Sequence, residues 1–424
     1  MAVLFLLALA FMIVSGVAEK ARLTAMVCLG ARALIAMGSS ASERGFYGAG
    51  EDGELFLRLS SEIANSGQAY EWSFSLLGGG YQGFVQGYGT VLALLGAPDD
   101  RLAAHLISIV GAALCLLLLA RCWMLLLPDD IIGLKRLLVI YTFVPAIASN
   151  QSYVMREVWQ SVAVLAVFYT ALSWNRHGAR WWHVVLGPFG VALGASLHHS
   201  LPVTMVVVGL VAIALSQRLG FSFSSVRPSR IAGAVVITAV LLVAISPVLA
   251  QSARFQEIGS GEFVERAAAT VQAGENATGG ARAFYGAYSD VTKPWTWPLG
   301  FGAYQIFPIP LLQGRSPIDL IAIGENALRL WLLWSWWRVR SIVEPEHRSA
   351  TNYAVGIWFV IELAWSVGTI NWGTGARHHV MAFSLLLLAG YSSRRSAALL
   401  ADGDKTAVRP PVGPAAYVSA NDLR

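Results

Sequence analysis

Two adjacent carboxylates, Glu51 and Asp52, form the pair of residues in this sequence that is best suited to catalysis. They follow a glycine-flanked turn, FYGAGEDGE, directly after an apolar segment. A carboxylate that is ionised at neutral pH and held at a membrane surface can act as a general base on an acceptor hydroxyl. The same residues also suit the first turn of a helix, where the helix dipole favours acidic side chains. Both interpretations stay open at this point.

A second candidate is the basic residue Arg156, which is followed by the acid Glu157. Arg156 and Glu157 occur in MREVWQS near the start of an apolar run. Arginine within a membrane span is costly, so such a residue normally faces protein or a watery cavity. Arg156 could therefore bind a phosphate oxygen, or it could extend to the headgroups with Glu157 as its partner.

Histidines recur at two further span ends, in ASLHHSLP and NWGTGARHHV. Four histidines and one arginine at one depth could form a cationic pocket for a phosphate leaving group, or neutral imidazoles could ligate a metal. Phosphate binding fits better, because no Asp or Cys accompanies the histidines at a recognisable ligand spacing. We therefore expect no metal site and no certain cofactor, with a divalent metal or simple hydrogen-bonded histidines as alternatives. The residues concerned are His198, His199, Arg377, His378 and His379.

One more acid, Glu325, occurs about two turns into an otherwise apolar segment, IDLIAIGENALRLWLLW. An acidic residue inside the membrane is a candidate functional residue by default. We expect it to pair with a basic group on a neighbouring helix, either Arg156 or Arg377. Structural pairing and catalysis are both open for it.

The composition indicates the environment in which these residues must be held. Of 424 residues, 56% are hydrophobic and 13% are charged, whereas soluble domains carry about 25% charged residues. Apolar runs of roughly 20 residues, the length needed to cross a membrane, recur along the chain. The net charge of +5 comes mostly from basic residues at span ends, and no basic stripe with interleaved aromatics predicts nucleic-acid binding. The three cysteines lack zinc or disulfide spacing and are interpreted as packing residues.

We predict an all-α polytopic integral membrane protein with about 11 transmembrane helices. Residues 1–395 form the membrane domain, and the first apolar run is interpreted as a retained span. Basic clusters alternate so that they fall on one side, which the positive-inside rule makes cytoplasmic. The expected spans are Val3–Ala18, Leu23–Gly38, Leu102–Leu126, Leu137–Ser149, Val154–Trp174, Trp181–His198, Leu201–Leu215, Ile231–Leu249, Ile318–Trp337, Tyr353–Gly368 and Val380–Tyr391.

Two long loops then lie on the non-cytoplasmic face, at about residues 39–101 and 251–317. The first contains GEDGELFLRLSSEIANSG, in which apolar residues recur at helical spacing opposite charged ones, so it predicts a helix lying in the membrane interface. The second, with WTWPLGFGAYQIFPIP, suits an interfacial or re-entrant segment. Residues 396–424 are polar, contain PPVGP, and predict a disordered cytoplasmic tail.

The order of these features resembles the GT-C superfamily of membrane glycosyltransferases, in which an early outer loop carries an acidic residue followed by an interfacial helix. The resemblance covers roughly Gly48 to Leu215 and includes EDGELFLRLSSEIANSG, the stretch from YQGFVQGYG to LLLLARC, and PAIASNQSYVMREVWQSVAVL. ASLHHS and NWGTGARHH resemble segments of EpsG-type proteins and other membrane proteins of exopolysaccharide and O-antigen clusters. The chain departs from the family pattern at Gln82, where proline is usual, and in its Glu-Asp acidic motif.

This resemblance implies a sugar transferase of the inner or plasma membrane that uses a polyprenyl-phosphate donor on the non-cytoplasmic face. The acceptor would be a glycan, lipid or protein of the cell envelope. The alternatives are a repeat-unit polymerase or ligase, and a lipid-linked glycan transporter or flippase without covalent chemistry. Asp52 would be the catalytic base with Glu51 in support, and the substrate-binding residues would be Arg156, His198, His199, Glu325, Asn371, Arg377 and His378.

Overall fold

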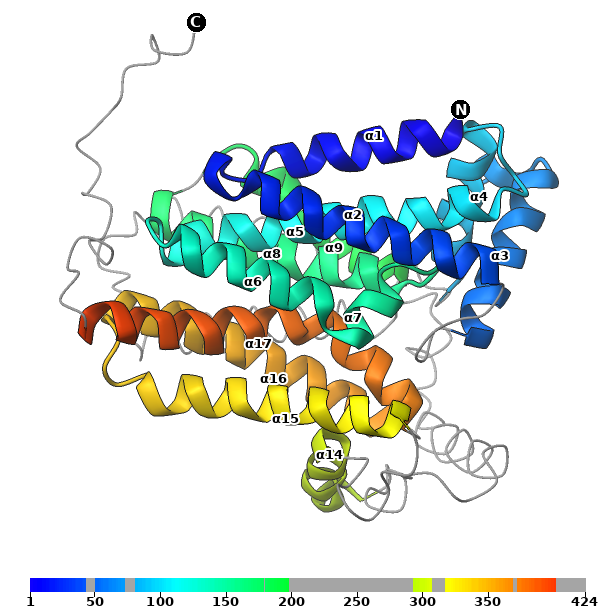
Figure 1. The fold of residues 1–424 in the computed structure, drawn as a ribbon. Helices are drawn as coiled ribbons and strands as arrows, with labels where there is room; N and C mark the ends of the chain where they lie inside the picture. Colours follow the sequence, from blue (N-terminus) through cyan, green and yellow to red (C-terminus); the bar gives the residue numbers. More distant parts are fainter. Residues whose placement is uncertain are drawn as a thin grey trace, which may run out of the picture.

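The structure, a computed structural model, describes residues 1–42, 50–72, 81–178, 180–197, 293–306, 317–368 and 372–401. All regular structure in these ranges is helical, which confirms the predicted all-α class for this part of the chain. The long helices run side by side, and the shorter α3 and α4 lie at one end of them (Figure 1). The elements are α1 (Ala2–Ser15), α2 (Glu19–Ser42), α3 (Gly50–Asn65), η1 (Gln68–Tyr70), α4 (Gln82–Leu94), α5 (Arg101–Leu126), α6 (Ile131–Phe143), α7 (Pro145–Asn150), α8 (Glu157–His177), α9 (His183–Leu197), η5 (Pro294–Thr296), α14 (Trp297–Ile306), α15 (Pro317–Val339), α16 (Pro345–Gly368) and α17 (Trp372–Ala401).

The described helices lie near the predicted spans along the chain, but most of them do not have both the length and the apolar composition of a membrane span. Two of the described helices, α2 and α5, are long and apolar enough to cross a membrane, and α1 and part of α9 are shorter apolar helices. The expectation of about 11 spans is therefore not confirmed. The expected spans at 201–215 and 231–249 lie outside the described residues.

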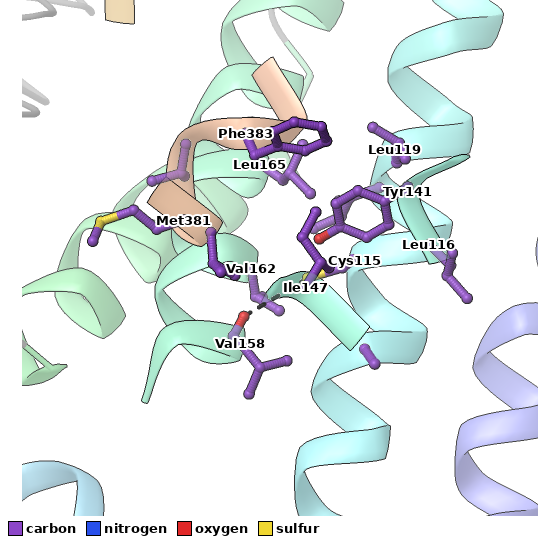
Figure 2. Close-up of a cluster of buried hydrophobic side chains, with 14 of the residues drawn as sticks. Cys115, Leu116, Leu119, Tyr141, Ile147, Val158, Val162, Leu165, Met381 and Phe383 are labelled. Carbon is purple, nitrogen blue, oxygen red and sulfur yellow. Dashed lines mark hydrogen bonds between the residues drawn. The ribbon is translucent and has the colours of Figure 1, made fainter. Parts of the chain in front are cut away.

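Helix α5 is the centre of the bundle and packs against α1, α2 and α8. Figure 2 shows its Cys115, Leu116 and Leu119 among apolar side chains from α6, α7, α8 and α17. The Cys115 thiol lies 3.7 Å from the carbonyl oxygen of Val158. All three cysteines are free and buried, so Cys115 fills a packing position between helices.

Helices α15 and α17 approach each other closely at Gly390. A Cβ atom at this position would lie 2.4 Å from the carbonyl oxygen of Leu332. Only glycine allows this separation, and small residues at such crossings are typical of helices packed in membranes.

Proline 145 divides one predicted span into α6 and α7. Because proline has no N–H, it cannot donate to the carbonyl of Tyr141 four residues earlier. The buried guanidinium of Arg32 donates to that oxygen at 2.9 Å and to the carbonyl oxygen of Thr142 at 3.0 Å. The helix break also leaves the N–H of Ala146 without its usual partner in the preceding turn, and this N–H donates to Glu325 at 2.6 Å. Side chains from other helices thus form hydrogen bonds with the backbone groups on both sides of the helix break.

One end of the bundle, here called the basic end, carries the turns that join α1 to α2, α5 to α6, α8 to α9 and α15 to α16, together with the last turns of α17 (Figure 1). Three contacts join these segments. Arg121 donates to the carbonyl oxygen of Gly16 at 3.0 Å, and the ion pairs Arg176–Glu346 and Arg395–Asp130 have distances of 3.0 and 2.8 Å. The basic clusters expected on one side lie at this end, except Arg218, Arg227 and Arg230, which lie outside the described residues.

Helix α17 continues to Ala401, past the position where the sequence predicted a disordered tail to begin. Ser396 and Leu399 are buried, and the Arg395–Asp130 ion pair fixes the preceding turn. These contacts favour helix over disorder through Ala401. The remainder of the predicted tail lies outside the described residues.

Candidate active site

Helix α3, predicted from GEDGELFLRLSSEIANSG, presents Asp52 from its first turn. The next residue, Gly53, lies flat against the ring of Tyr153, and an added Cβ would come within 2.2 Å of that ring. The ring of Tyr153 is packed edge-on against His105, with centroids 4.6 Å apart. Glycine at position 53 therefore allows the start of α3 to dock closely on the segment before α8.

The carboxylate of Asp52 forms an ion pair with Arg377 from the start of α17. The Asp52 side chain is 46% exposed, whereas that of Arg377 is 14% exposed. The carboxylate is thus open to a molecule arriving from solvent, while the arginine is held mostly within the protein. This contact brings together the predicted base and the predicted phosphate-binding arginine.

A second polar cluster anchors α3 on its other side. Arg101 Nη1 donates to Glu54 Oε2 at 2.8 Å, its Nη2 also contacts Glu54, and the Tyr153 hydroxyl donates to the same carboxylate. Burial raises the pKa of Glu54, but the hydrogen bonds from Arg101 and Tyr153 outweigh it, so the pKa lies below its ordinary value. Burial and the nearby carboxylate raise the pKa of Tyr153, which keeps its hydroxyl protonated as a donor. The cluster holds α3 in place with an ionised Glu54.

No pattern in the sequence predicts the Glu54 cluster. Its members are 47 and 99 residues from Glu54 along the chain, and no motif joins them. In the sequence, Glu54 is only one of the charged residues on the polar face of the predicted interfacial helix. The fold, not the spacing, brings these three side chains together.

Two further predicted residues lie near the ion pair. His378 is buried and stacks on Trp365, with ring centroids 4.3 Å apart. The positive charges of Arg377 and Arg156 both act on its imidazole. Arg156 is the N-cap residue of α8 and is half-buried. Burial, together with these charges, holds the pKa of His378 well below its ordinary value, so its imidazole is neutral and the positive charge near Asp52 comes from Arg377 and Arg156.

Glu325 is buried, and its carboxylate accepts a hydrogen bond from the backbone N–H of Ala146. The expected pairing of Glu325 with Arg156 or Arg377 stays a prediction. With Arg329 and His379, Glu325 lines a small cavity of about 10 Å³, which is near the volume that one water molecule needs. The hydrogen bond to Ala146 shows that Glu325 helps to stabilise the break between α6 and α7.

A buried acid that the sequence reasoning missed is Glu362 of α16. Its side chain is fully buried, contacts His379 Nδ1 at 2.5 Å and accepts from Gln305 at 2.8 Å. His379 also lies 3.3 Å from the carbonyl oxygen of Tyr304. The apolar context of VIELAWS is the same signal that singled out Glu325, so Glu362 could have been identified in the same way.

Other predicted residues cannot be placed. His198, His199 and Asn371 lie outside the described residues, and only the backbone of Glu51 is described, within α3. An open cleft of about 690 Å³ adjoins the site, between α3 and the start of α5. Its polar lining consists of Glu54, Arg58, Ser61, Glu62, Asn65, Ser66, Asp99 and Arg101.

Searches against protein-family models, curated proteins and solved structures found no match to this chain.

Proposed function

We propose that this chain is a membrane-embedded glycosyltransferase that transfers a sugar from a polyprenyl-phosphate carrier to a glycan, lipid or protein acceptor of the cell envelope. The observation that carries the proposal is the ion pair between Asp52 and Arg377. It places a solvent-accessible carboxylate beside a cationic group at one end of a helical bundle. Sugar transfer from a phosphate needs these two groups together.

Membrane embedding is supported by the apolar outer surface of the bundle. Exposed apolar side chains follow one face of α2 at Leu23, Val27 and Leu34. Large exposed apolar faces are typical of surfaces that meet lipid or another protein. Exposed aromatic residues occur at both ends of the bundle, as they do at the two interfaces of membrane proteins. They include Tyr70, Trp72 and Tyr81 near α3 and Trp181, Trp334 and Trp337 at the basic end.

The proposed reaction is an inverting displacement at C1 of the donor sugar. An acceptor hydroxyl oxygen forms the new bond to C1, and its proton passes to the carboxylate of Asp52. The bond between C1 and the phosphate oxygen breaks, and both electrons leave with the polyprenyl phosphate. The positive charges of Arg377 and Arg156 would stabilise the negative charge that develops on that phosphate, and the neutral imidazole of His378 would donate a hydrogen bond to it.

The ion pair also suggests an order of events. With no donor bound, Asp52 neutralises Arg377. A donor phosphate would compete for the guanidinium, since arginine binds phosphate through paired hydrogen bonds. Movement of Arg377 toward the phosphate would free a carboxylate oxygen of Asp52 to accept the acceptor proton. Donor binding would thus prepare the base.

Two alternatives use other features of the molecule. A repeat-unit polymerase or ligase would use the same site with a longer acceptor. Transport without covalent chemistry is favoured by one observation, the buried group of Glu362, His379 and Arg329 inside the bundle, because transporters place ionisable groups near the middle of the membrane.

The test is a reconstitution of the purified full-length protein in proteoliposomes with a radiolabelled polyprenyl-phosphate sugar and a hydroxyl-bearing acceptor glycan. The proposal predicts transfer of label to the acceptor and release of unglycosylated carrier. Movement of the intact labelled carrier between leaflets, without release of polyprenyl phosphate, would support the transporter and refute the transferase.

A further inference from the structure

A second charged surface lies at the basic end, far from the candidate active site. The last turns of α15 expose Trp331, Trp334 and Trp337, which are 38%, 50% and 57% exposed. Tryptophan is rarely so exposed in a monomeric soluble protein unless it contributes to an interface. Three such residues on one helix end indicate a surface that meets another phase or molecule. We call the surface formed by Trp331, Trp334, Trp337, Arg338, Arg340 and Arg394 the tryptophan–arginine belt.

An arginine guanidinium packs against each of these tryptophan rings. The guanidinium carbon of Arg340 lies 3.4 Å from the ring centroid of Trp337. That of Arg338 lies 5.0 Å from Trp334, and that of Arg394 of α17 lies 5.2 Å from Trp331. Stacking uses the flat face of the guanidinium and leaves its in-plane N–H groups able to bind an anion.

These arginines differ from others at the same end of the bundle. Arg176 pairs with Glu346 and Arg395 pairs with Asp130. In the part of the chain that the structure describes, no carboxylate forms an ion pair with any of the three belt arginines, Arg338, Arg340 and Arg394. The belt therefore presents positive charge that its described surroundings do not neutralise.

We propose that the tryptophan–arginine belt binds the headgroup phosphate of anionic glycerophospholipids. The charge is complementary to a phosphodiester, and tryptophan rings favour the depth at which headgroup meets acyl chain. Helix α15 supplies the surface for the acyl chains as well, because Leu320 and Leu330 are exposed along it. A soluble anion would gain nothing from this apolar surface, whereas a lipid uses both parts.

This inference rests on the membrane embedding in the proposed function and is independent of sugar transfer. It also predicts how the protein is oriented in the membrane. Anionic lipids of the cytoplasmic leaflet would hold the basic end at that leaflet, which leaves the Asp52–Arg377 pair at the opposite face.

The experiment uses the full-length protein purified in a neutral detergent. Dioleoylphosphatidylglycerol or dioleoylphosphatidylcholine is titrated in, and lipid binding is measured by native mass spectrometry together with the thermal unfolding midpoint. The test variant carries Arg338→Gln, Arg340→Gln and Arg394→Gln. The matched control is Arg176→Gln, which removes an arginine at the same end that is already paired with Glu346.

We expect the anionic lipid to bind more tightly than the zwitterionic lipid and to raise the unfolding midpoint of the wild type and of the control. Each lost belt charge should weaken phosphatidylglycerol binding about fivefold. Equal binding of both lipids, unchanged binding by the triple variant, or full competition by inorganic phosphate would each overturn the proposal. If the triple variant does not fold, the single variants Arg338→Gln and Arg394→Gln, both at exposed positions, decide by the same criterion.

The outcome separates this proposal from the proposed function. A chain that stays soluble without detergent would refute membrane embedding and with it the lipid site. A chain that needs detergent but binds both lipids equally would refute the lipid site alone. Neither result depends on whether sugar transfer is observed.

Discussion

Asp52 and Arg377 form an ion pair although 325 positions separate them along the chain. The contact joins the first turn of α3 to the start of α17. It therefore ties a short helix at the end of the bundle to one of the long helices that build it. The same two residues are those that the sequence suggested as base and phosphate ligand.

Replacement of Arg377 tests the leaving-group role. Arg377→Ala should lower single-turnover transfer by about 10²-fold to 10³-fold, as expected when a preorganised donor to developing charge is removed. Arg377→Lys should lose less, because it keeps the charge without the paired hydrogen bonds. The control is Arg58→Ala on α3, whose ion pair with Glu62 at 3.8 Å is exposed. Wild-type rates in a folded Arg377→Ala protein would remove Arg377 from the site.

The pKa of Glu54 predicts how stability depends on pH. Because this pKa is lowered in the folded protein, Glu54 contributes stability that is fully present above its ordinary pKa of about 4.3. That contribution is lost as the pH falls through the lower folded value. Glu54→Gln should therefore be less stable than wild type at neutral pH, and the difference should shrink in acid. The measurement is the thermal unfolding midpoint between neutral and strongly acidic pH.

The matched control for Glu54 is Glu62→Gln on the same helix. Glu62 has a 63% exposed side chain and only a surface ion pair, which is worth little. It should leave the pH profile of wild type unchanged. A Glu54→Gln protein whose stability difference from wild type is constant with pH would contradict the role given to the Glu54 cluster.

Arg32 should be a large contributor to stability. Arg32→Met would leave the buried carbonyls of Tyr141 and Thr142 without donors, at a cost of about 1–3 kcal/mol for each unsatisfied group. The exposed Arg22 on the same helix provides the control. Denaturant unfolding of Arg22→Met should resemble wild type. If Arg32→Met is equally stable, the helix break at Pro145 does not depend on Arg32.

The orientation of the bundle can be measured by cysteine labelling of intact cells. The native cysteines are buried, so background labelling should be low. Asn65→Cys, at an exposed position near the site, should react with a membrane-impermeant maleimide from outside. Ser341→Cys, exposed at the basic end, should react only after the membrane is opened. Equal labelling of both positions from outside would refute the proposed topology.

Local patterns in the sequence predicted the helices well. The amphipathic stretch expected at residues 50–67 is α3, and the segment expected at Leu102–Leu126 is α5. Helical periodicity and apolar composition are properties of contiguous residues, so one sequence suffices to read them. The break at Pro145 was missed because its surroundings are continuously apolar and the stabilising Arg32 is remote in the chain.

The site was harder to predict than the helices. Residue types singled out Asp52, Arg156, Arg377 and His378, but their proximity depends on how α3, α8 and α17 pack. The hydrogen bond from the N–H of Ala146 to Glu325 was not predicted from the sequence. The helix break at Pro145 leaves this N–H in need of an acceptor, and hydropathy alone does not reveal that need.

The proposed function depends most directly on Asp52 as the base. Asp52→Asn keeps the shape of the side chain but cannot accept the acceptor proton, so transfer should fall by about 10²-fold to 10⁴-fold. Donor binding should be retained or tightened, because Arg377 loses the carboxylate that competes with phosphate. The control is Asp99→Asn, an acid of the adjoining cleft that accepts from Ser61 and Asn65.

The decisive measurement is single-turnover transfer by purified wild type, Asp52→Asn and Asp99→Asn with a polyprenyl-phosphate sugar, together with the dissociation constant of the donor. The account predicts loss of transfer with retained donor binding for Asp52→Asn alone. Near-normal turnover by a folded Asp52→Asn protein would contradict it, and α3 would then be an interfacial helix without a catalytic residue at position 52.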